Sequence, residues 1–201
     1  IEEYSSMSGA CTINDDGTII AIPHWNSSNN TSVISIHKNT NGTWKQMGSI
    51  IEGDENDYFG ARTSSISFDS TGYRIAIGAY NIGGGHVDIF DWNESLDEWE
   101  SVVTIQGTAD NMQFGYSVSM NSNGTVLSIS APNDSDYGSV TVYKETNGIW
   151  NLFGTKITTT EINSNFGVCT KISSDGNTVV IGSVGLSEKQ NGHVKVYIHD
   201  G

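Results

Sequence analysis

Two acidic loops carry the side chains best suited to hold a metal ion. One reads Glu52-Gly53-Asp54-Glu55-Asn56-Asp57 and the other Asn133-Asp134-Ser135-Asp136. Carboxylates on flexible loops suit Ca²⁺, which takes several oxygen ligands. The candidate ligands are Asp54, Asp57, Asp134 and Asp136. Solvated loop charge is the competing interpretation, because neither spacing completes a calcium-binding loop. No other cofactor is indicated.

The five histidines offer little evidence of catalysis. They are His24, His37, His86, His193 and His199. His86 and His193 occupy the same position in two sequence repeats described below, which favours a role in the scaffold. The chain contains no H-E-x-x-H or G-x-S-x-G motif, and no Ser-His-Asp grouping can be read from the sequence. We therefore expect a protein that is not an enzyme.

The two cysteines, Cys11 and Cys169, both fall on the first predicted strand of a repeat. Cys169 aligns one place earlier than Cys11, and successive strand residues face opposite sides. The two positions also lie three repeats apart. We expect no disulfide between them and predict buried free thiols, since cysteine is well tolerated in cores.

Seven N-x-S/T sequons indicate a possible glycoprotein, and nearly all fall in predicted loops or turns, where an acceptor asparagine must be exposed. The acceptors are Asn26, Asn29, Asn30, Asn41, Asn93, Asn123 and Asn133. Three of them crowd the loop HWNSSNNTS, so we do not expect all to be occupied. The pattern favours a secreted or cell-surface protein in which at least one sequon carries a glycan.

Composition excludes two broad classes of partner. The 201 residues include 23 acids and 9 Lys or Arg, which gives a net charge of −14. Nucleic acid would be repelled, because its binding requires clustered basic side chains. No apolar run approaches the length of a membrane span. The abundance of Gly, with 23 residues, and the short apolar runs predict many strands and turns.

The chain repeats one unit four times. The turn glycines Gly17, Gly72, Gly124 and Gly176 are 55, 52 and 52 residues apart, and an apolar strand follows each. Three units also carry an upstream Phe-Gly pair: Phe59-Gly60, Phe114-Gly115 and Phe166-Gly167. Each period predicts four antiparallel strands, the last of which holds Trp44, Trp99 or Trp150 as blade packing.

A repeat of this length predicts an all-β propeller of four-stranded antiparallel blades. The units span about 8–51, 59–106, 114–158 and 166–201 within a single domain, 1–201. The fourth unit stops where its Trp strand is expected. Four blades could close imperfectly, but we favour four consecutive blades of a larger ring.

The unit FG-x-SVS-x₄-G-x₂-L-x-I-x-AP, followed by G-x-V-x-VY, resembles the FG-GAP repeat over essentially the whole chain. That family includes the seven-bladed head of integrin α subunits and many extracellular adhesion-type proteins. The resemblance implies that the Phe-Gly corners and the Ala-Pro loops share one rim, which carries partner contacts in integrins. One departure is clear: the integrin-type loop D-x-D-x-D-G is replaced here by a short hairpin turn, so calcium on that opposite rim is not supported.

The function that we expect is a non-catalytic extracellular interaction or structural module. It would present rim loops to a protein or glycan, or to other parts of a larger surface assembly. The candidate partner-binding residues are Trp25, Tyr58 and Tyr137, because exposed aromatic side chains can stack on sugars or anchor a partner. The alternative is a carbohydrate-active or lectin-like propeller, which a cluster of Asp57, Asp110 and Asp136 at the ring mouth would favour.

Overall fold

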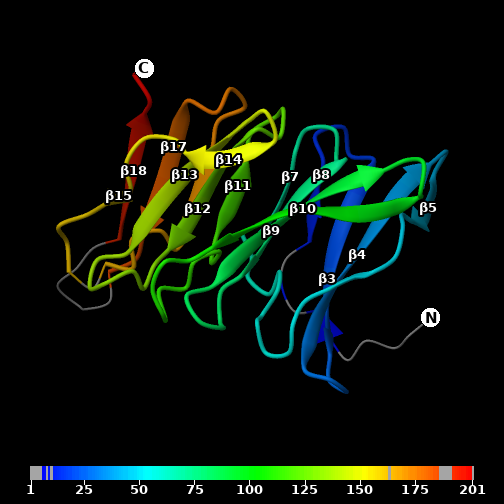
Figure 1. Ribbon diagram of the computed structural model, residues 1–201, viewed down its shortest axis with the longest axis horizontal. Helices are drawn as coiled ribbons and strands as arrows, with labels where there is room; N and C mark the ends of the chain where they lie inside the picture. Colours follow the sequence, from blue (N-terminus) through cyan, green and yellow to red (C-terminus); the bar gives the residue numbers. More distant parts are fainter. Residues whose placement is uncertain (1–5, 8, 10, 163, 186–191, 201) are drawn as a thin grey trace.

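The computed structural model describes residues 6–7, 9, 11–162, 164–185 and 192–200, and these residues form four antiparallel β-sheets without a helix (Figure 1). The sheets follow one another along the chain, so each matches one predicted blade. The fold class predicted from the repeats is confirmed. Within the described residues, no helix long and apolar enough to cross a lipid bilayer is found.

Blade 1 is the largest sheet, with the order β1-β3-β4-β5, and β2 and β6 pair with β3 and β4 respectively. Its strands are β1 (Ser6–Met7), β2 (Thr12–Ile13), β3 (Ile19–Asn26), β4 (Thr31–Thr40), β5 (Thr43–Gln46) and β6 (Ile51–Glu52). Blade 2 has the order β10-β9-β8-β7. Its strands are β7 (Ile66–Phe68), β8 (Arg74–Ala79), β9 (His86–Asn93) and β10 (Glu98–Gln106).

Blade 3 has the order β11-β12-β13-β14, with β15 paired to β13. Its strands are β11 (Val118–Met120), β12 (Val126–Ala131), β13 (Ser139–Thr146), β14 (Ile149–Leu152) and β15 (Ile157–Thr158). Blade 4 has the order β16-β17-β18, formed by β16 (Cys169–Ile172), β17 (Thr178–Ser183) and β18 (His193–Ile198). In Figure 1 the blades lie side by side, and the sheets at the two ends of the chain are farthest apart.

The first hairpin of each blade is fixed by a polar residue before the turn glycine. In blade 3, Asn121 Oδ1 accepts hydrogen bonds from the N–H groups of Thr125 and Val126, at 3.0 and 2.8 Å. Asn14 does the same in blade 1. The turn glycine Gly124 has φ +72°, a conformation that Gly adopts without the cost other residues incur. Asp69 in blade 2 and Ser173 in blade 4 accept backbone hydrogen bonds in the same way, so this polar residue closes each hairpin and sets its register.

The core lies between neighbouring blades. We call the side of a blade toward the next blade its front face and the opposite side its back face. Between blades 1 and 2, Ile34 and Ile36 on the front face pack with Ile75 and Ile77 on the back face. The same arrangement recurs between blades 2 and 3 and between blades 3 and 4. Each sheet thus buries apolar side chains on a neighbour, as the repeat requires.

The innermost strands also hold one another by hydrogen bonds across blades. The Met120 N–H donates to Ser67 Oγ at 3.0 Å, and the Thr170 N–H donates to Ser117 Oγ at 3.0 Å. The turns form a second series of bonds: the N–H of Asp15 donates to Ser70 O, Ser70 to Ser122 O, and Ser122 to Ser174 O. Each turn is therefore bonded to the turn of the next blade.

Two predictions about packing are wrong in part. Trp99 and Trp150 pack on the clusters behind their blades, and the Trp99 indole N–H donates to Met47 O at 3.0 Å. Trp44, however, is 42% exposed. Its repeat position lies on the back face, and the described residues place no blade behind blade 1. The repeat located all three tryptophans, but it could not show that no described residues cover Trp44.

The cysteines are free, as expected, but both are exposed rather than buried. Cys169 lies on the front face of blade 4, and Cys11 stands beside β2 at a back-face position of blade 1. Neither face is covered by another blade among the described residues. The prediction of buried thiols is wrong for the described residues, because it assumed that another blade covers each of these faces.

Candidate binding surface on one rim

The Phe-Gly corners are built into the junctions between blades. Phe59, Phe114 and Phe166 are buried in the three interblade clusters. Gly115 has φ +90°, and a Cβ there would lie 2.4 Å from His86 O in the preceding blade. A Cβ on Gly78, in the strand next to that corner, would lie 2.0 Å from Gly115 O. Close backbone approach across the junction therefore requires glycine at both positions.

Four aromatic side chains form a row along this rim. The ring centroids of Trp25 and Tyr58 are 6.0 Å apart, those of Tyr58 and Tyr80 are 5.6 Å apart, and those of Tyr80 and Tyr116 are 5.3 Å apart. Trp25 lies in β3 of blade 1, and Tyr116 follows the Phe-Gly corner of blade 3. The row therefore crosses three blades. Tyr58 is 38% exposed, whereas Tyr80 is buried beneath it.

Arg62 joins the row at its Tyr116 end. Its guanidinium carbon lies 4.9 Å from the ring centroid of Tyr80 and 4.6 Å from that of Tyr116. Burial raises the pKa of the Tyr80 hydroxyl, and the nearby Arg62 charge partly opposes the shift. We call Trp25, Tyr58, Tyr80, Tyr116 and Arg62 the rim aromatic cluster.

A depression of about 360 Å³ opens beside Arg62. Corner residues of all four blades line it: Gly9, Ala61, Arg62, Thr63, Ser64, Tyr116 and Val168. The ring faces and the exposed guanidinium next to it suit stacking and hydrogen bonding, which recognise sugars and aromatic or anionic groups. No cysteine or histidine lines this depression.

The structure brings together two of the three predicted partner-binding residues. Trp25 and Tyr58 are in contact. Tyr137 lies in the loop before β13, where its carbonyl accepts a hydrogen bond from Ser164, and it takes no part in the row. The sequence reasoning missed Tyr80, Tyr116 and Arg62. Two of these could have been found, because Tyr116 directly follows a Phe-Gly pair and Tyr80 occupies the place of Pro132 after β8.

The acidic loops gain no support as a calcium site. Asp57 is 1% exposed, and its carboxylate accepts hydrogen bonds from the N–H groups of Asp54 and Phe59, at 2.8 and 2.9 Å. Burial raises the pKa of this carboxyl, and the two N–H donors oppose the shift. Asp57 thus fixes the backbone that leads into the Phe-Gly corner.

Asp134 is used in a similar way, since its carboxylate accepts from Ser139 Oγ at 2.6 Å and from Lys156 Nζ at 2.8 Å. Those two hydrogen bonds, against the opposing effect of burial, lower the pKa of Asp134. Asp54, Asp136 and Asp110 are exposed. In the described part of the chain, no three His, Cys, Asp or Glu side chains are grouped to hold a metal ion.

One serine, one histidine and one glutamate meet in blade 4 in the order of a hydrolase triad. Ser183 Oγ lies 2.9 Å from His193 Nε2, and His193 Nδ1 lies 3.1 Å from Glu161 Oε2. Ser183 is only 6% exposed, however, and its hydroxyl also donates to the backbone carbonyl of His193. Because the two residues are direct cross-strand neighbours, the contact is explained by strand pairing.

The sequon asparagines lie at accessible positions. Asn29, Asn30, Asn41, Asn123 and Asn133 are exposed, and Asn26 and Asn93 are half-buried at strand ends. Asn93 Oδ1 accepts from the N–H groups of Ser95 and Leu96, so part of its amide is used within the turn. Asn41 sits at the tip of the hairpin that joins β4 and β5. Whether any acceptor carries a glycan stays a prediction.

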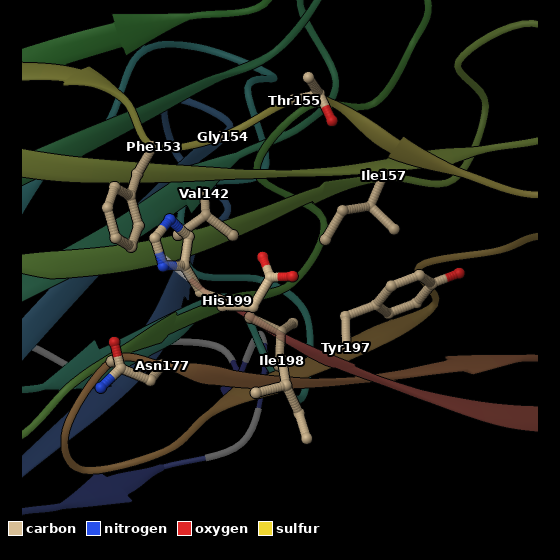
Figure 2. A pocket seen from close by; sticks show the side chains of 12 residues that line it. Val142, Phe153, Gly154, Thr155, Ile157, Asn177, Tyr197, Ile198 and His199 are labelled. Atoms are coloured by element: carbon tan, nitrogen blue, oxygen red, sulfur yellow. The ribbon is translucent and has the colours of Figure 1, made fainter.

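An apolar groove of about 330 Å³ lies between blades 3 and 4 (Figure 2). Phe153 and His199 stack at one end of the groove, with ring centroids 4.2 Å apart, and Ile157 and Tyr197 lie at the other end. By repeat register, Phe153-Gly154 correspond to Met47-Gly48, on which Trp99 lies between blades 1 and 2. The groove therefore lies at the position that Trp99 occupies between blades 1 and 2.

Comparison with known proteins identifies the fold alone. No family model and no curated protein matches the chain. Among solved structures, TolB from Acinetobacter baumannii is similar over 96% of this chain and 41% of its own, with 13% identity and a TM-score of 0.55. A hypothetical selenium-binding protein from Sulfolobus tokodaii gives 79% and 42%, with 9% identity and a TM-score of 0.58.

The β-propeller domain of the Trilobed protease from Pyrococcus furiosus, described as having an open velcro topology, is similar over 95% of this chain and 54% of its own. The identity is 16% and the TM-score is 0.50. The chain therefore spans about half or less of the length of these three structures. They support four blades of a β-propeller and say nothing of its activity.

Proposed function

We propose that this chain is a non-catalytic interaction module that binds its partner through the rim aromatic cluster. The observation that carries the proposal is the row from Trp25 to Tyr116 with Arg62 at its end. Such a row places ring faces and one cation side by side on a rigid rim. Rigid aromatic side chains lose little conformational entropy on binding, which makes them effective anchors.

A glycan is the partner chemistry that the row favours. The exposed Tyr58 ring and the adjacent Trp25 offer flat apolar faces for the C–H side of a sugar ring. Arg62 offers donors to hydroxyl or carboxylate oxygens. A protein partner that bears such a glycan would use the same surface. Of the alternative function, a carbohydrate-active or lectin-like propeller, the row of aromatic rings favours the lectin-like form. A hydrolase would need a cluster of carboxylates at the site, and the buried Asp57 does not contribute to one.

The test compares two tyrosines of equal exposure. Tyr58 and Tyr73 are 38% and 37% exposed, but Tyr73 follows a hairpin turn away from the row. Glycan-array binding followed by calorimetry with the best glycan would be measured for the wild type, Tyr58→Ala and Tyr73→Ala. We expect Tyr58→Ala to weaken binding about tenfold or more, which corresponds to about 1.4 kcal/mol, and Tyr73→Ala to leave it unchanged.

If Tyr58→Ala and Tyr73→Ala bind the best glycan with equal affinity, the row of aromatic rings is not the binding site. Failure of the wild type to bind any glycan, together with Tyr58-dependent capture of a deglycosylated protein, would support the module while replacing the glycan by a protein partner.

We also propose that the module belongs to an extracellular or cell-surface assembly of FG-GAP-type propellers. Three in-phase Phe-Gly corners and accessible sequons support this setting. Expression in a glycosylating eukaryotic host, with a mass shift on endoglycosidase treatment, tests it. Secretion without any glycan on the seven sequons would count against the glycoprotein part of the proposal.

A further inference from the structure

The Phe-Gly corner of blade 2 is three residues longer than that of blade 3. In each blade, one residue of the second strand bonds to both ends of the corner: its C=O accepts from the corner glycine, and its N–H donates to the residue before the first strand. Counted from the glycine, the added residues are Arg62, Thr63 and Ser64, which we call the corner insertion. The corners run from Gly60 to Ser65 in blade 2, bonded to Gly78, and from Gly115 to Ser117 in blade 3, bonded to Ser130.

The fold does not require the corner insertion. Blade 4 also has the short corner, in which one residue separates Gly167 from Cys169. The Gly167 N–H donates to Gly182 O at 3.0 Å, as the corner glycines of blades 2 and 3 donate to their second strands. Since two blades close this corner without added residues, the side chains of the insertion are free to serve another purpose.

The corner insertion lines the depression of about 360 Å³ described above, a volume within the range of small-molecule sites. Among the described residues that line it, Arg62 is the one charged side chain, and Thr63 and Ser64 add two hydroxyl groups. None of these lining residues is Asp or Glu, although the whole chain has a net charge of −14. The insertion therefore places a positive charge and polar groups together in a chain that is acidic elsewhere.

Arg62 is held by aromatic rings rather than by a carboxylate. Its guanidinium carbon lies 4.9 and 4.6 Å from the ring centroids of Tyr80 and Tyr116. In the part of the chain that the structure describes, none of the ion pairs includes Arg62. Its backbone is fixed as well, because the buried Ser65 Oγ accepts from the Arg62 N–H at 3.0 Å and donates to Arg62 O at 2.9 Å. A guanidinium stacked on rings keeps the N–H donors at its edge available to a bidentate acceptor.

Tyr58, beside the insertion, has a backbone conformation that is unusual for a tyrosine. Its φ is +57°, and the residues at the same place in blades 3 and 4, directly before the corner phenylalanine, are Gln113 at +59° and Asn165 at +44°. Asn adopts this region readily, whereas a bulky residue there is an outlier. Strain of this kind concentrates at binding sites. The strained, 38% exposed ring stacks on Tyr80, which Arg62 also contacts, so a ligand of one or two sugar rings could reach both.

We propose that the depression and the Tyr58 ring bind a sugar that carries a carboxylate group, such as a sialic or uronic acid. The carboxylate accepts a pair of hydrogen bonds from Arg62, the hydroxyls of Thr63 and Ser64 meet those of the sugar, and its apolar face lies on Tyr58. This inference rests on the proposed function and specifies the chemistry of its ligand. A ligand with many negative charges is disfavoured, because a net charge of −14 repels it.

Calorimetry with two acid–ester pairs tests the role of the carboxylate. The probes are sialyllactose and glucuronyllactose, each compared with its methyl ester, which removes the charge and keeps the sugar rings. We expect the wild type to bind at least one acid about tenfold more tightly than its ester, because hydrogen bonds to a charged group are lost in the ester. Lactose and sulfolactose are measured beside them, as a neutral sugar and a sulfated one.

Arg62→Gln removes the charge from the depression, and Lys45→Gln is its matched control. Lys45 is exposed on the outer strand β5 of blade 1, and either substitution makes the net charge more negative by one. We expect Arg62→Gln to bind acid and ester with equal affinity and Lys45→Gln to keep the tenfold preference. Arg62→Lys keeps the charge without the planar fork and should keep part of the preference. Because Arg62 is exposed, its substitution should leave the fold intact, and circular dichroism checks this.

Four results would overturn the assignment of a carboxylate. They are a wild type that binds each acid and its ester equally, an Arg62→Gln variant that still prefers the acid, a Lys45→Gln variant that loses the preference, and tighter binding of sulfolactose than of either acid. If Arg62→Gln does not fold, the acid–ester ratio of the wild type still decides the question.

Failure of this inference differs from failure of the proposed function. If the wild type binds lactose or the esters as tightly as the acids, and Tyr58→Ala weakens that binding, the lectin-like function stands and the carboxylate assignment falls. If the wild type binds none of the sugars, both the glycan partner and the carboxylate assignment fall.

Discussion

Arg74 joins blades 2 and 3 and offers a measurable test of how the blades hold together. Its guanidinium donates to both carboxylate oxygens of Asp91, at 2.6 and 2.7 Å, and to Glu145 of blade 3. It also donates to Gly124 O at 3.0 Å. The paired carboxylates raise the pKa of Arg74 above its already high ordinary value, with the Asp91 hydrogen bond as the largest cause.

The expected cost of Arg74→Met follows from burial. The side chains of Arg74 and Glu145 are 18 and 17% exposed, whereas Asp91 is 41% exposed. Breaking a fully buried pair costs about 3–5 kcal/mol and an exposed one about 0–1 kcal/mol. Because Glu145 would lose its partner in a junction that is mostly shielded from water, we expect Arg74→Met to lower the free energy of unfolding by about 3 kcal/mol. In the double variant with Glu145→Gln, part of this loss should return, with a coupling energy of about 1–2 kcal/mol.

Urea unfolding followed by far-UV circular dichroism would measure these free energies. The matched control is Lys156→Met, which breaks the pair with Asp134 in which the lysine is 53% exposed. We expect that control to cost less than about 1 kcal/mol. If Arg74→Met costs no more than Lys156→Met, the junction is not held by this pair and the reasoning fails.

Three further outcomes are expected. Gly115→Ala should cost about 3 kcal/mol in urea unfolding, because a Cβ would meet His86 O at 2.4 Å at φ +90°, whereas Gly42→Ala, at φ +84° in open space, should cost about 1 kcal/mol; equal costs would contradict the close approach. The Asp88 hydrogen bond raises the pKa of His86, so its stabilisation is complete below the ordinary value of 6.5 and lost as pH rises through the raised value. His86→Gln should therefore destabilise the chain more at about pH 5.5 than at about pH 8, and a pH-independent effect in urea melts would refute this. Asn41, exposed at a hairpin tip, should be the sequon most readily occupied in a glycosylating host, and peptide mapping that finds it bare while buried-edge Asn93 is modified would reverse that order.

Much of the fold could be predicted because one pattern repeats in register. The turn glycine and the apolar strand after it recur four times, and the structure closes each of these hairpins as expected. Strand pairing matches Ile34, and not the preceding Val33, with Val87 and Val140, which is a shift of one residue from the alignment of the repeats. The longer first unit hid that shift, and only strand pairing could reveal it.

The candidate site was harder to predict because it is assembled between blades. Trp25 and Tyr58 were recognised as loop aromatics, but the stacking of Tyr58 on Tyr80 depends on how two blades are rotated about the axis. The surroundings of Asp57 were hard to predict for a related reason, because a carboxylate in an acidic loop is expected to face solvent or a metal ion. In the structure this carboxylate turns inward and accepts hydrogen bonds from two backbone N–H groups.

The turn-to-turn hydrogen bonds have a mechanical consequence. Asp15, Ser70, Ser122 and Ser174 are joined in sequence, each to the next alone. A pulling force on one end of the chain would therefore load one of these hydrogen bonds before the others, and the blades would detach one at a time. Stretching in an optical trap should then produce a sawtooth of separate rips, one for each blade that detaches.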